Sequence, residues 1–389
     1  MNILHRTKLS AAFCAASIGL SLAHQASAEV TTKISGYGTL AGTVTDDGDM
    51  QFRSSLNQSK GAGDKLDLGV DSRLGLQGNV NFGSGLSVTA QLLGQRRRTD
   101  ATAKSNEDFS VGFEWLYAQY SPTSNIDLRL GRIVLPAFMI SDSRNVGYTQ
   151  PWLRAPMSVY AGMPLTTLDG VQGLFRVPMG STILSIQPSY GESAFNISSG
   201  SAVLKSTSHP VVGLNAGLEF GDWLLRAGQV RGTSQLNGVV LSPFLAGAPL
   251  THKMKDVFTS AGLQYDNGTA VLMTEWTQRK QNNIDSSYFP GAPFNIGGKP
   301  LAESRAWYLA GGWRFGKWLP MLSYGENKNT LTSDKTHNTS VSLRYDLMAN
   351  VALKAQVGRY DAKDGAAFVQ NDVTKSTVNT FAIGVDFVF

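Results

Sequence analysis

The amino-acid sequence predicts an all-β fold, a 16-stranded antiparallel transmembrane β-barrel. Apolar and polar residues alternate with a period of two along most of the chain, which is typical of strands. The predicted connections alternate between short and long, as in an even-stranded barrel with its turns at one end and its loops at the other. Only 16% of the residues are charged, whereas ordinary soluble domains carry about 25%.

The first 28 residues are set apart from the barrel by their composition. Arg6 and Lys8 precede an apolar stretch over residues 9–23, and an A-x-A cleavage site follows at Ala26 and Ala28. This order is that of a secretory signal peptide. A single transmembrane anchor is the alternative, and it is disfavoured because the apolar stretch is short and contains three serines. We therefore expect an exported chain whose signal peptide is cleaved.

The segment 72–82 shows the alternation that predicts a strand. Leu74, Leu76 and Val80 share one side of the predicted strand, and polar residues occupy the other. The next segment, 85–97, alternates in the same way. Because a glycine-rich tight turn separates the two segments, we expect a hairpin.

The same pattern continues through a barrel domain expected at residues 29–389. The predicted strands lie at about 33–44, 72–82, 85–97, 109–121, 125–133, 168–177, 180–190, 210–220, 222–231, 256–266, 268–279, 304–315, 317–327, 338–347, 351–361 and 377–389. The long connections between them are predicted at 45–71, 98–108, 134–167, 191–209, 232–255, 280–303, 328–337 and 362–376.

The apolar side of each strand is expected to face lipid. Side chains cannot fill the interior of a barrel of 16 strands, so the polar side must line water. Within a bilayer, a closed barrel also satisfies every backbone hydrogen bond. Aromatic residues near the predicted strand ends would form girdles at the two membrane interfaces. They are Trp115, Tyr117, Trp223, Trp313, Phe315, Trp318, Tyr324 and Tyr345.

The chain resembles the Gram-negative outer-membrane porins. The signal peptide, the opening KISGYGTLAG, the alternating strands and the ending FAIGVDFVF carry this resemblance. Phe389 and Phe387 look like the terminal signal read by the barrel-assembly machinery. The segment LRLGRIVLPAFMISDSRNVGYTQPWLRAP is similar to a group of proteobacterial putative porins related to channels for dicarboxylates and other organic anions. The resemblance implies an outer-membrane location, contact with lipid and lipopolysaccharide, and a homotrimer.

The connection at 134–167 is too rich in aromatic and apolar residues to be an ordinary solvated loop. In porins the third long loop folds into the barrel and narrows it, and the resemblance implies this for 134–167. Its charges are predicted to form the constriction, and three cations against two anions would favour anions. They are Asp142, Arg144 and Arg154, with Arg132 just before the loop and Asp169 just after it. Alternatively, Asp142 and Arg144 pair with each other or with backbone and merely hold the loop.

Charged residues on the polar sides of the strands are predicted to line the lumen. The basic ones are Arg73, Arg129, Arg176, Arg226, Arg314, Arg344 and Lys354, and they are opposed by Glu114 and Asp127. An excess of cations across the lumen would raise the local concentration of anions. Two alternatives stay open: a polar face is often merely solvated, and a bulge can reverse the parity of a strand.

The predicted function is the diffusion of small hydrophilic solutes, with a preference for anions. The alternatives are a substrate-specific channel for organic anions such as dicarboxylates or aromatic acids, and a barrel that acts as an adhesin or structural anchor. No catalytic motif supports an enzyme, and no cofactor or metal is expected. Without Arg6 and Lys8 the chain has 32 basic and 29 acidic residues, a net charge of +3 that is too mild to indicate a nucleic-acid partner.

Overall fold

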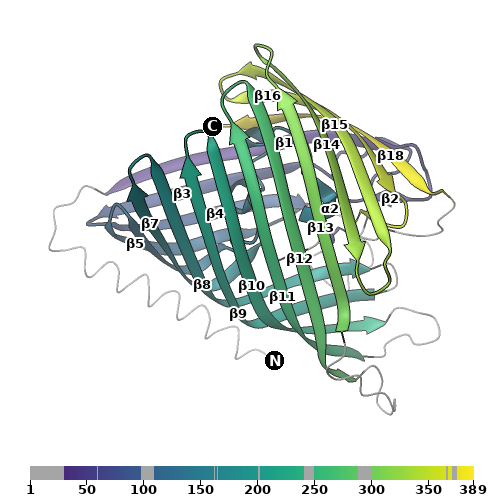
Figure 1. The fold of residues 1–389 in the computed structure, drawn as a ribbon, viewed down its shortest axis with the longest axis horizontal. Helices are drawn as coiled ribbons and strands as arrows, with labels where there is room; N and C mark the ends of the chain where they lie inside the picture. The colour runs from purple at the N-terminus through teal and green to yellow at the C-terminus, as the bar shows by residue number, and fades with distance from the viewer. Residues whose placement is uncertain are drawn as a thin grey trace.

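Sixteen antiparallel strands close into a barrel in the computed structural model, and β1 pairs with both β3 and β18. Figure 1 shows the tilted strands side by side along the wall. The structure describes residues 30–58, 60–97, 109–161, 163, 165–199, 202–240, 249–287, 300–364, 367–369 and 375–389. The expected signal peptide lies outside these residues. Within them, no helix has the length and apolar character needed to cross a membrane.

The barrel strands are β1 Thr31–Thr45, β3 Arg73–Gly83, β4 Leu86–Arg96, β5 Phe109–Thr123, β6 Ile126–Val134, β7 Thr167–Met179, β8 Thr182–Ser199, β9 Ala202–Phe220, β10 Trp223–Val240, β11 Pro249–Asp266, β12 Ala270–Ser287, β13 Pro300–Trp313, β14 Trp318–Asn329, β15 Lys335–Met348, β16 Val351–Asp361 and β18 Thr377–Val388. Two short strands, β2 Gln51–Phe52 and β17 Phe368–Val369, pair with each other in a separate sheet that is not part of the barrel wall. The helical turns are η1 Ser141–Ser143, η2 Gly147–Thr149 and α2 Met157–Tyr160.

All sixteen predicted strands are confirmed, but three of the predicted long connections are wrong. The segments 191–209, 232–255 and 280–303 were expected to be loops, and much of each continues the neighbouring strands. Strands β8 and β9, for example, stay paired as far as Ser199 and Ala202. The hydrogen-bond ladder continues where the strands no longer need an apolar side, so the alternation that marks a strand fades before the strand ends.

The outer face of the barrel is apolar, as the alternation predicts. Val111, Ile34 and Ile383 project from it with 71%, 70% and 68% of their surface exposed. Many further aliphatic side chains on alternate positions do the same. An isolated soluble protein rarely exposes this much contiguous apolar surface, so the band is the surface that meets lipid.

The barrel closes where the last strand meets the first. Phe389 and Gly36 exchange two backbone hydrogen bonds of 2.8 and 2.9 Å. The rings of Phe387 and Phe389 stack with centroids 6.4 Å apart and lie across Gly38 and Gly36. A Cβ atom at Gly36 or Gly38 would lie 2.2 or 2.3 Å from the ring beside it, so any other residue there would have to displace that ring.

Candidate functional site: three loops and the cavities between them

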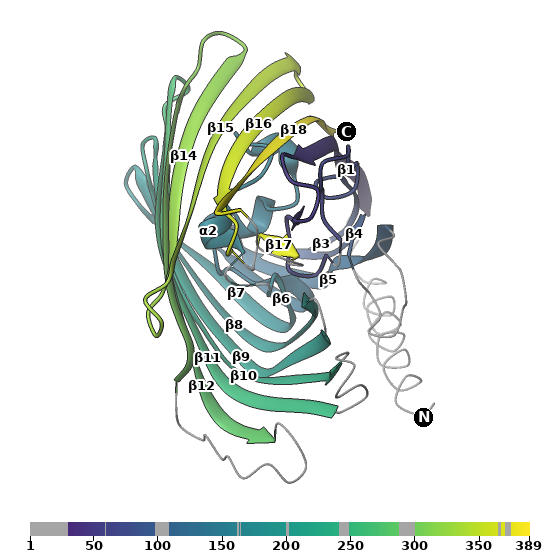
Figure 2. The ribbon, with the colours of Figure 1, turned by 90° about the vertical axis from the view of Figure 1, so that its right-hand side faces the viewer.

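The loop between β6 and β7, named L3 here (residues 135–166), lies inside the barrel. Figure 2 shows its short helix α2 in the interior, surrounded by the wall. Buried apolar side chains cover the side of L3 that faces β9 to β14; they are Leu135, Phe138, Met139, Ile140, Trp152, Val159, Tyr160, Met163 and Leu165. An apolar loop of this kind needs an apolar surface to pack against.

The inner wall supplies that surface. The expectation that the lumen face is polar throughout is wrong, because part of it carries Val211, Val230, Phe258, Met273, Tyr308 and Met321, all buried against L3. Phe138 packs between Phe258 and Tyr160, with ring centroids 5.2 and 5.1 Å away. The strand pattern concealed this patch because a strand with apolar residues on both sides no longer alternates clearly.

Polar side chains of the wall hold the backbone of L3. Glu275 on β12, only 1% exposed, accepts hydrogen bonds from the Met139 N–H at 3.0 Å and the Tyr160 hydroxyl at 2.7 Å. Burial and the neighbouring Glu275 carboxyl both raise the pKa of Tyr160, so its hydroxyl stays protonated and donates. On β16, the Gln356 side chain accepts from the backbone of Leu153 and Arg154.

Two of the cations that were predicted to line the lumen also bind the backbone of L3. Lys354 forms a 2.7 Å ion pair with Asp386 and donates to the carbonyl oxygens of Gly147 and Trp152 at 2.7 and 3.0 Å. Arg344 donates to the carbonyl oxygens of Tyr148 and Gln150 at 2.5 and 3.0 Å. Both side chains face inward, yet they hold the loop and line neither of the two chambers nor the neck described below.

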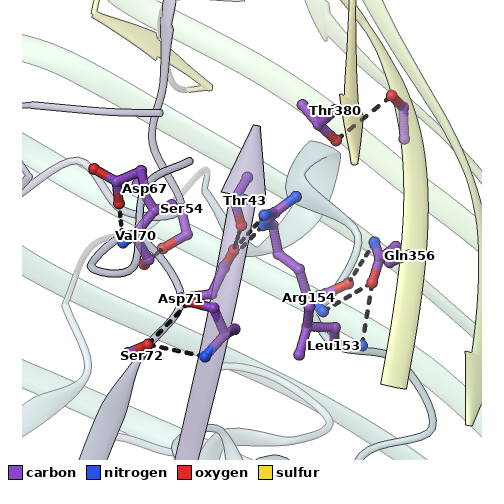
Figure 3. A network of polar contacts seen from close by, with 12 residues as sticks. Thr43, Ser54, Asp67, Val70, Asp71, Ser72, Leu153, Arg154, Gln356 and Thr380 are labelled. Atoms are coloured by element: carbon purple, nitrogen blue, oxygen red, sulfur yellow. Dashed lines mark hydrogen bonds and ion pairs between the residues drawn. The ribbon is translucent and has the colours of Figure 1, made fainter. Parts of the chain in front are cut away.

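The loop between β1 and β3, named L1 (residues 46–72), also folds inward and is fastened to L3. Asp71 at the end of L1 pairs with Arg154 of L3 through two hydrogen bonds, one of them 3.0 Å long from Nε, and Thr43 donates to Asp71 at 2.7 Å (Figure 3). The Arg154 guanidinium lies 4.2 Å from the ring centroid of Phe52. Burial opposes the ionisation of Asp71, but Arg154 outweighs it and lowers the pKa of that carboxyl.

The loop between β16 and β18, named L8 (residues 362–376), joins L1 over α2. Strands β2 and β17 pair, and an apolar cluster forms beneath them from Met50, Phe52, Ala62, Val70, Met157, Tyr360, Ala362, Ala367, Phe368 and Val378. The sequence pattern did not predict this contact. The available signal was the pair Met50 and Phe52, two apolar residues that flank Gln51 among the polar residues at the start of L1.

Among the described residues, three cavities between these loops and the wall of β3 to β10 bear on the path of a solute. An inner chamber of about 510 Å³ is lined by Trp115, Tyr117, Arg129, Val134, Met139, Asp142, Leu174, Arg176, Ser185, Gln187, Asn215, Gly217, Glu219, Leu224 and Arg226. An outer chamber of about 140 Å³ lies between L1, L3 and strands β3 to β5. A neck of only about 10 Å³ shares Asp142 with the inner chamber and Glu114, Arg144 and Asn145 with the outer one. Because the neck shares lining residues with both chambers, we refer to the three cavities together as the path.

The predicted constriction residues of L3 lie along this path. Arg144 lines the neck, where it donates to the Tyr160 carbonyl at 3.1 Å and lies 5.7 Å from the ring centroid of Phe138. Asp142 does not pair with Arg144; its carboxylate lies 3.4 Å from Arg226. Arg154 lines the outer chamber, with its charge opposed by Asp71.

The predicted lumen residues divide into three groups. Arg73 and Glu114 line the outer chamber, and Arg129, Arg176 and Arg226 line the inner one. Asp127 lies next to the inner chamber, 2.9 Å from Arg176. Arg314 lies beside the short turn between β13 and β14, where it pairs with Asp266 at 2.6 Å and lines none of the three cavities.

Two of the predicted constriction residues lie on the outside of the barrel. Arg132 and Asp169 are cross-strand partners and form a bidentate pair with both distances 2.7 Å. Arg132 is opposite Leu116, and Leu130 two residues earlier is 63% exposed, so this is the lipid-facing side. The prediction placed Arg132 by its closeness to the loop. Its odd spacing from the inward-facing Arg129 puts it on the opposite face.

Trp115 and Tyr117 are also misplaced by the sequence pattern. Both were expected in an outer girdle, and both line the inner chamber. The register of β4 against β5 shifts between Gln91 and Leu92, which leaves Glu114 as an extra residue. Such a bulge reverses the parity of every residue that follows it. The exposed aromatics Trp313, Phe315 and Trp318 keep their predicted outer position.

A closed, lipid-facing barrel with a loop-lined path through it defines an outer-membrane channel for small solutes. The family model described as Gram-negative porin matches residues 10–365, and the chain belongs to that family. Its place is the outer membrane. No curated protein matches the sequence.

Solved structures share the fold at low sequence identity. The outer membrane channel DcaP of Acinetobacter baumannii matches with a TM-score of 0.56 at 15% identity, over 94% of this chain and 99% of that one. An anion-selective porin from Comamonas acidovorans matches with a TM-score of 0.55 at 16% identity, over 93% and 100%. OmpT of Vibrio cholerae, described in a trimer form, matches with a TM-score of 0.54 at 14% identity, over 93% and 100%.

Proposed function

We propose that this porin is a diffusion channel that prefers small anions. The observation that carries the proposal is the charge along the three cavities. Seven arginines line them, namely Arg73, Arg97, Arg129, Arg144, Arg154, Arg176 and Arg226. Four carboxylates do so, namely Asp71, Glu114, Asp142 and Glu219. A narrow path with low-dielectric walls focuses such a field and enriches anions along it.

Ion pairs between arginines and carboxylates do not cancel the excess of positive charge along the path. Asp71 opposes Arg154, Asp142 opposes Arg226, and Asp127 opposes Arg176. Within the described residues, no carboxylate is within ion-pair distance of Arg73, Arg97, Arg129 or Arg144, the four other arginines that line the path. Of the carboxylates that line the path, only Glu114 and Glu219 are left to balance the charge of these four arginines. The four arginines are spread over both chambers, and this supports an anion preference along the whole path.

Reversal potentials in a planar bilayer under a KCl gradient test this proposal. The expected sign is that of chloride moving more easily than potassium. A potassium preference would overturn the proposal, and an absence of conductance steps would favour the alternative of a barrel that serves as an adhesin or anchor.

A second candidate is a channel specific for certain organic anions. The neck favours it, because Arg144, Asn145 and Glu114 line a cavity of only about 10 Å³ there, so a solute that enters it must contact them. Block of the chloride current by a carboxylate, saturating with concentration, would support this candidate. Additive currents with no block would support simple diffusion.

We also infer that the protein works as a homotrimer. The trimer described for OmpT of Vibrio cholerae and an apolar hollow of about 790 Å³ on the outer wall, lined by Leu40, Leu66, Leu68 and Ile383 among others, support this. Light scattering of the detergent-solubilised protein tests it, with the monomer mass as the contradicting result.

The ends of the chain carry two further proposals. We propose that residues 1–28 are a signal peptide cleaved after Ala28, with Ala26 at the other small position of the site. Phe389 and Phe387 would then be read by the barrel-assembly machinery, and the finished barrel would contact lipid and lipopolysaccharide. Amino-terminal sequencing of the exported protein checks the first proposal, and loss of the folded barrel on deletion of Phe389 checks the second.

A further inference from the structure

One part of the inner chamber is lined by apolar side chains, although a water-filled lumen does not require them. They come from the wall and from L3, and they are Trp115, Tyr117, Val134, Met139, Leu174 and Leu224. Trp115, Tyr117, Leu174 and Leu224 are only half-buried, so they leave apolar surface open to the chamber. The chamber holds about 510 Å³, which is within the usual range of about 300–1,000 Å³ for pockets that bind small molecules.

A bulge in strand β5 turns Trp115 and Tyr117 into this chamber. The register of β4 against β5 shifts at Glu114, and without that extra residue both rings would point to lipid, as Phe113 does. Bulges occur often beside functional sites, where they redirect a side chain. The Arg129 guanidinium lies 5.2 Å from the ring centroid of Tyr117 and covers part of that ring. The ring of Trp115, which lines both the chamber and the neck, is therefore the better placed of the two to contact a solute.

The polar side of the chamber offers a hydrogen-bond donor that carries no charge. Arg226 donates to Asn215 at 2.8 Å and to the Gln187 side-chain oxygen at 3.4 Å, and Arg176 pairs with Asp127 at 2.9 Å. These arginines thus have partners in the protein. Gln187 is 7% exposed, and within the described residues its amide nitrogen has no acceptor. Buried donors are rarely left unpaired, so a carbonyl oxygen of a solute suits this nitrogen.

We propose that the inner chamber is a binding site for small, uncharged solutes that carry a flat aromatic ring and a carboxamide. The ring lies against Trp115, and the carbonyl oxygen accepts from Gln187. Aromatic rings attract one another in offset or edge-to-face arrangements, so a flat ring gains more from Trp115 than a saturated ring of similar size. The site rests on the proposed function only because it needs a channel open to solutes, and it does not depend on which ions the channel prefers.

Block of the single-channel chloride current by benzamide tests the site. Benzamide joins a flat ring to an uncharged carboxamide, and cyclohexanecarboxamide is its saturated counterpart. We expect a benzamide block that saturates with concentration, and a half-blocking concentration about threefold higher or more for cyclohexanecarboxamide. Trp115→Leu removes the ring without changing the net charge, and it should raise the half-blocking concentration of benzamide about threefold or more. Trp115→Phe keeps a ring and should retain most of the block.

Trp313→Leu is the matched control, because Trp313 is 51% exposed on the outer wall and lines none of the three cavities. It should keep the benzamide block of the unmodified protein. A chloride current that benzamide does not block would overturn the site while leaving the anion preference intact. Equal half-blocking concentrations for the two carboxamides, or for Trp115→Leu and Trp313→Leu, would also overturn it. A cation preference in the KCl gradient would instead refute the proposed function and leave the benzamide site in place.

Discussion

Asn145 of L3 donates a 3.1 Å hydrogen bond to the Glu114 carboxylate on β5, and both residues line the neck. This bond joins the loop to the wall at the neck. The opposite side of L3 is fixed by an extensive apolar contact with the wall. Solute passage should depend on this bond.

Asn145→Ala should therefore widen the neck and raise the single-channel conductance. The change removes a hydrogen bond to a charged group, which contributes about 1.5–3 kcal/mol. Conductance in KCl is the measurement, and Asn125→Ala at a short turn far from the neck is the control. An unchanged conductance in Asn145→Ala would mean that the bond does not limit the current.

Phe138→Ala should loosen L3 from the wall. Its ring is 2% exposed and packs against two other aromatic rings, and removal of such a side chain costs about 3–5 kcal/mol. We expect the open-channel current to become noisier and protease to cleave L3 in the folded barrel. A quiet current and a resistant loop would show that the polar contacts from Glu275 and Lys354 suffice to hold it.

The contact between L1 and L3 should depend on acid pH through Asp71. Its pKa is lowered in the folded protein, so the ionised pair stabilises this contact above the ordinary carboxyl range near pH ~4. That stabilisation is lost as the pH falls through the lowered value. Limited proteolysis of L1 over decreasing pH should show increasing cleavage only in strongly acidic buffer.

Asp71→Asn should remove that pH dependence and expose L1 at neutral pH. Arg154 would keep a buried charge without its partner, at a cost of about 3–5 kcal/mol. Asp266→Asn, which breaks an ion pair with Arg314 that involves neither L1 nor L3, is the matched control. Equal protease resistance of Asp71→Asn and the unmodified protein at pH 7 would contradict the prediction.

Arg129 and Arg132 should behave differently although only two residues separate them. Arg129 lines the inner chamber, so Arg129→Ala should shift the reversal potential toward cations. Arg132 faces lipid, so Arg132→Ala should leave the reversal potential unchanged. If both variants shift it equally, the strand register at this position is wrong.

The strands could be predicted from the sequence because lipid imposes a simple rule on the outer face. Every second residue there must lack a polar side chain, and this holds in residues 351–357 as in 74–82. The rule does not apply to parts of strands that extend beyond the membrane, and the sequence therefore did not predict the outer ends of β8 to β13. It also fails at Glu114, where one extra residue exchanges the two faces and moves Trp115 and Tyr117 into the lumen.

The interior was harder to predict because its contacts join distant parts of the chain. Arg144 and Arg154 were identified from their place in an aromatic-rich loop, and both line the path. Nothing local to Lys354 distinguishes a side chain that meets solute from one that binds the carbonyl of Gly147. The ion pair between Asp71 and Arg154 joins L1 to L3, and no periodicity or residue spacing in the sequence predicts it.

The seam between Gly36 and Phe389 joins strands from the two ends of the barrel domain. One edge of β1 pairs with β3, which is close in the sequence, and the other edge pairs with β18 at the far end of the chain. A chain that stops short of residues 377–389 would keep two unpaired edges and could add strands from a neighbour. The pairing of β1 with β18 is therefore what leaves the barrel without an exposed strand edge.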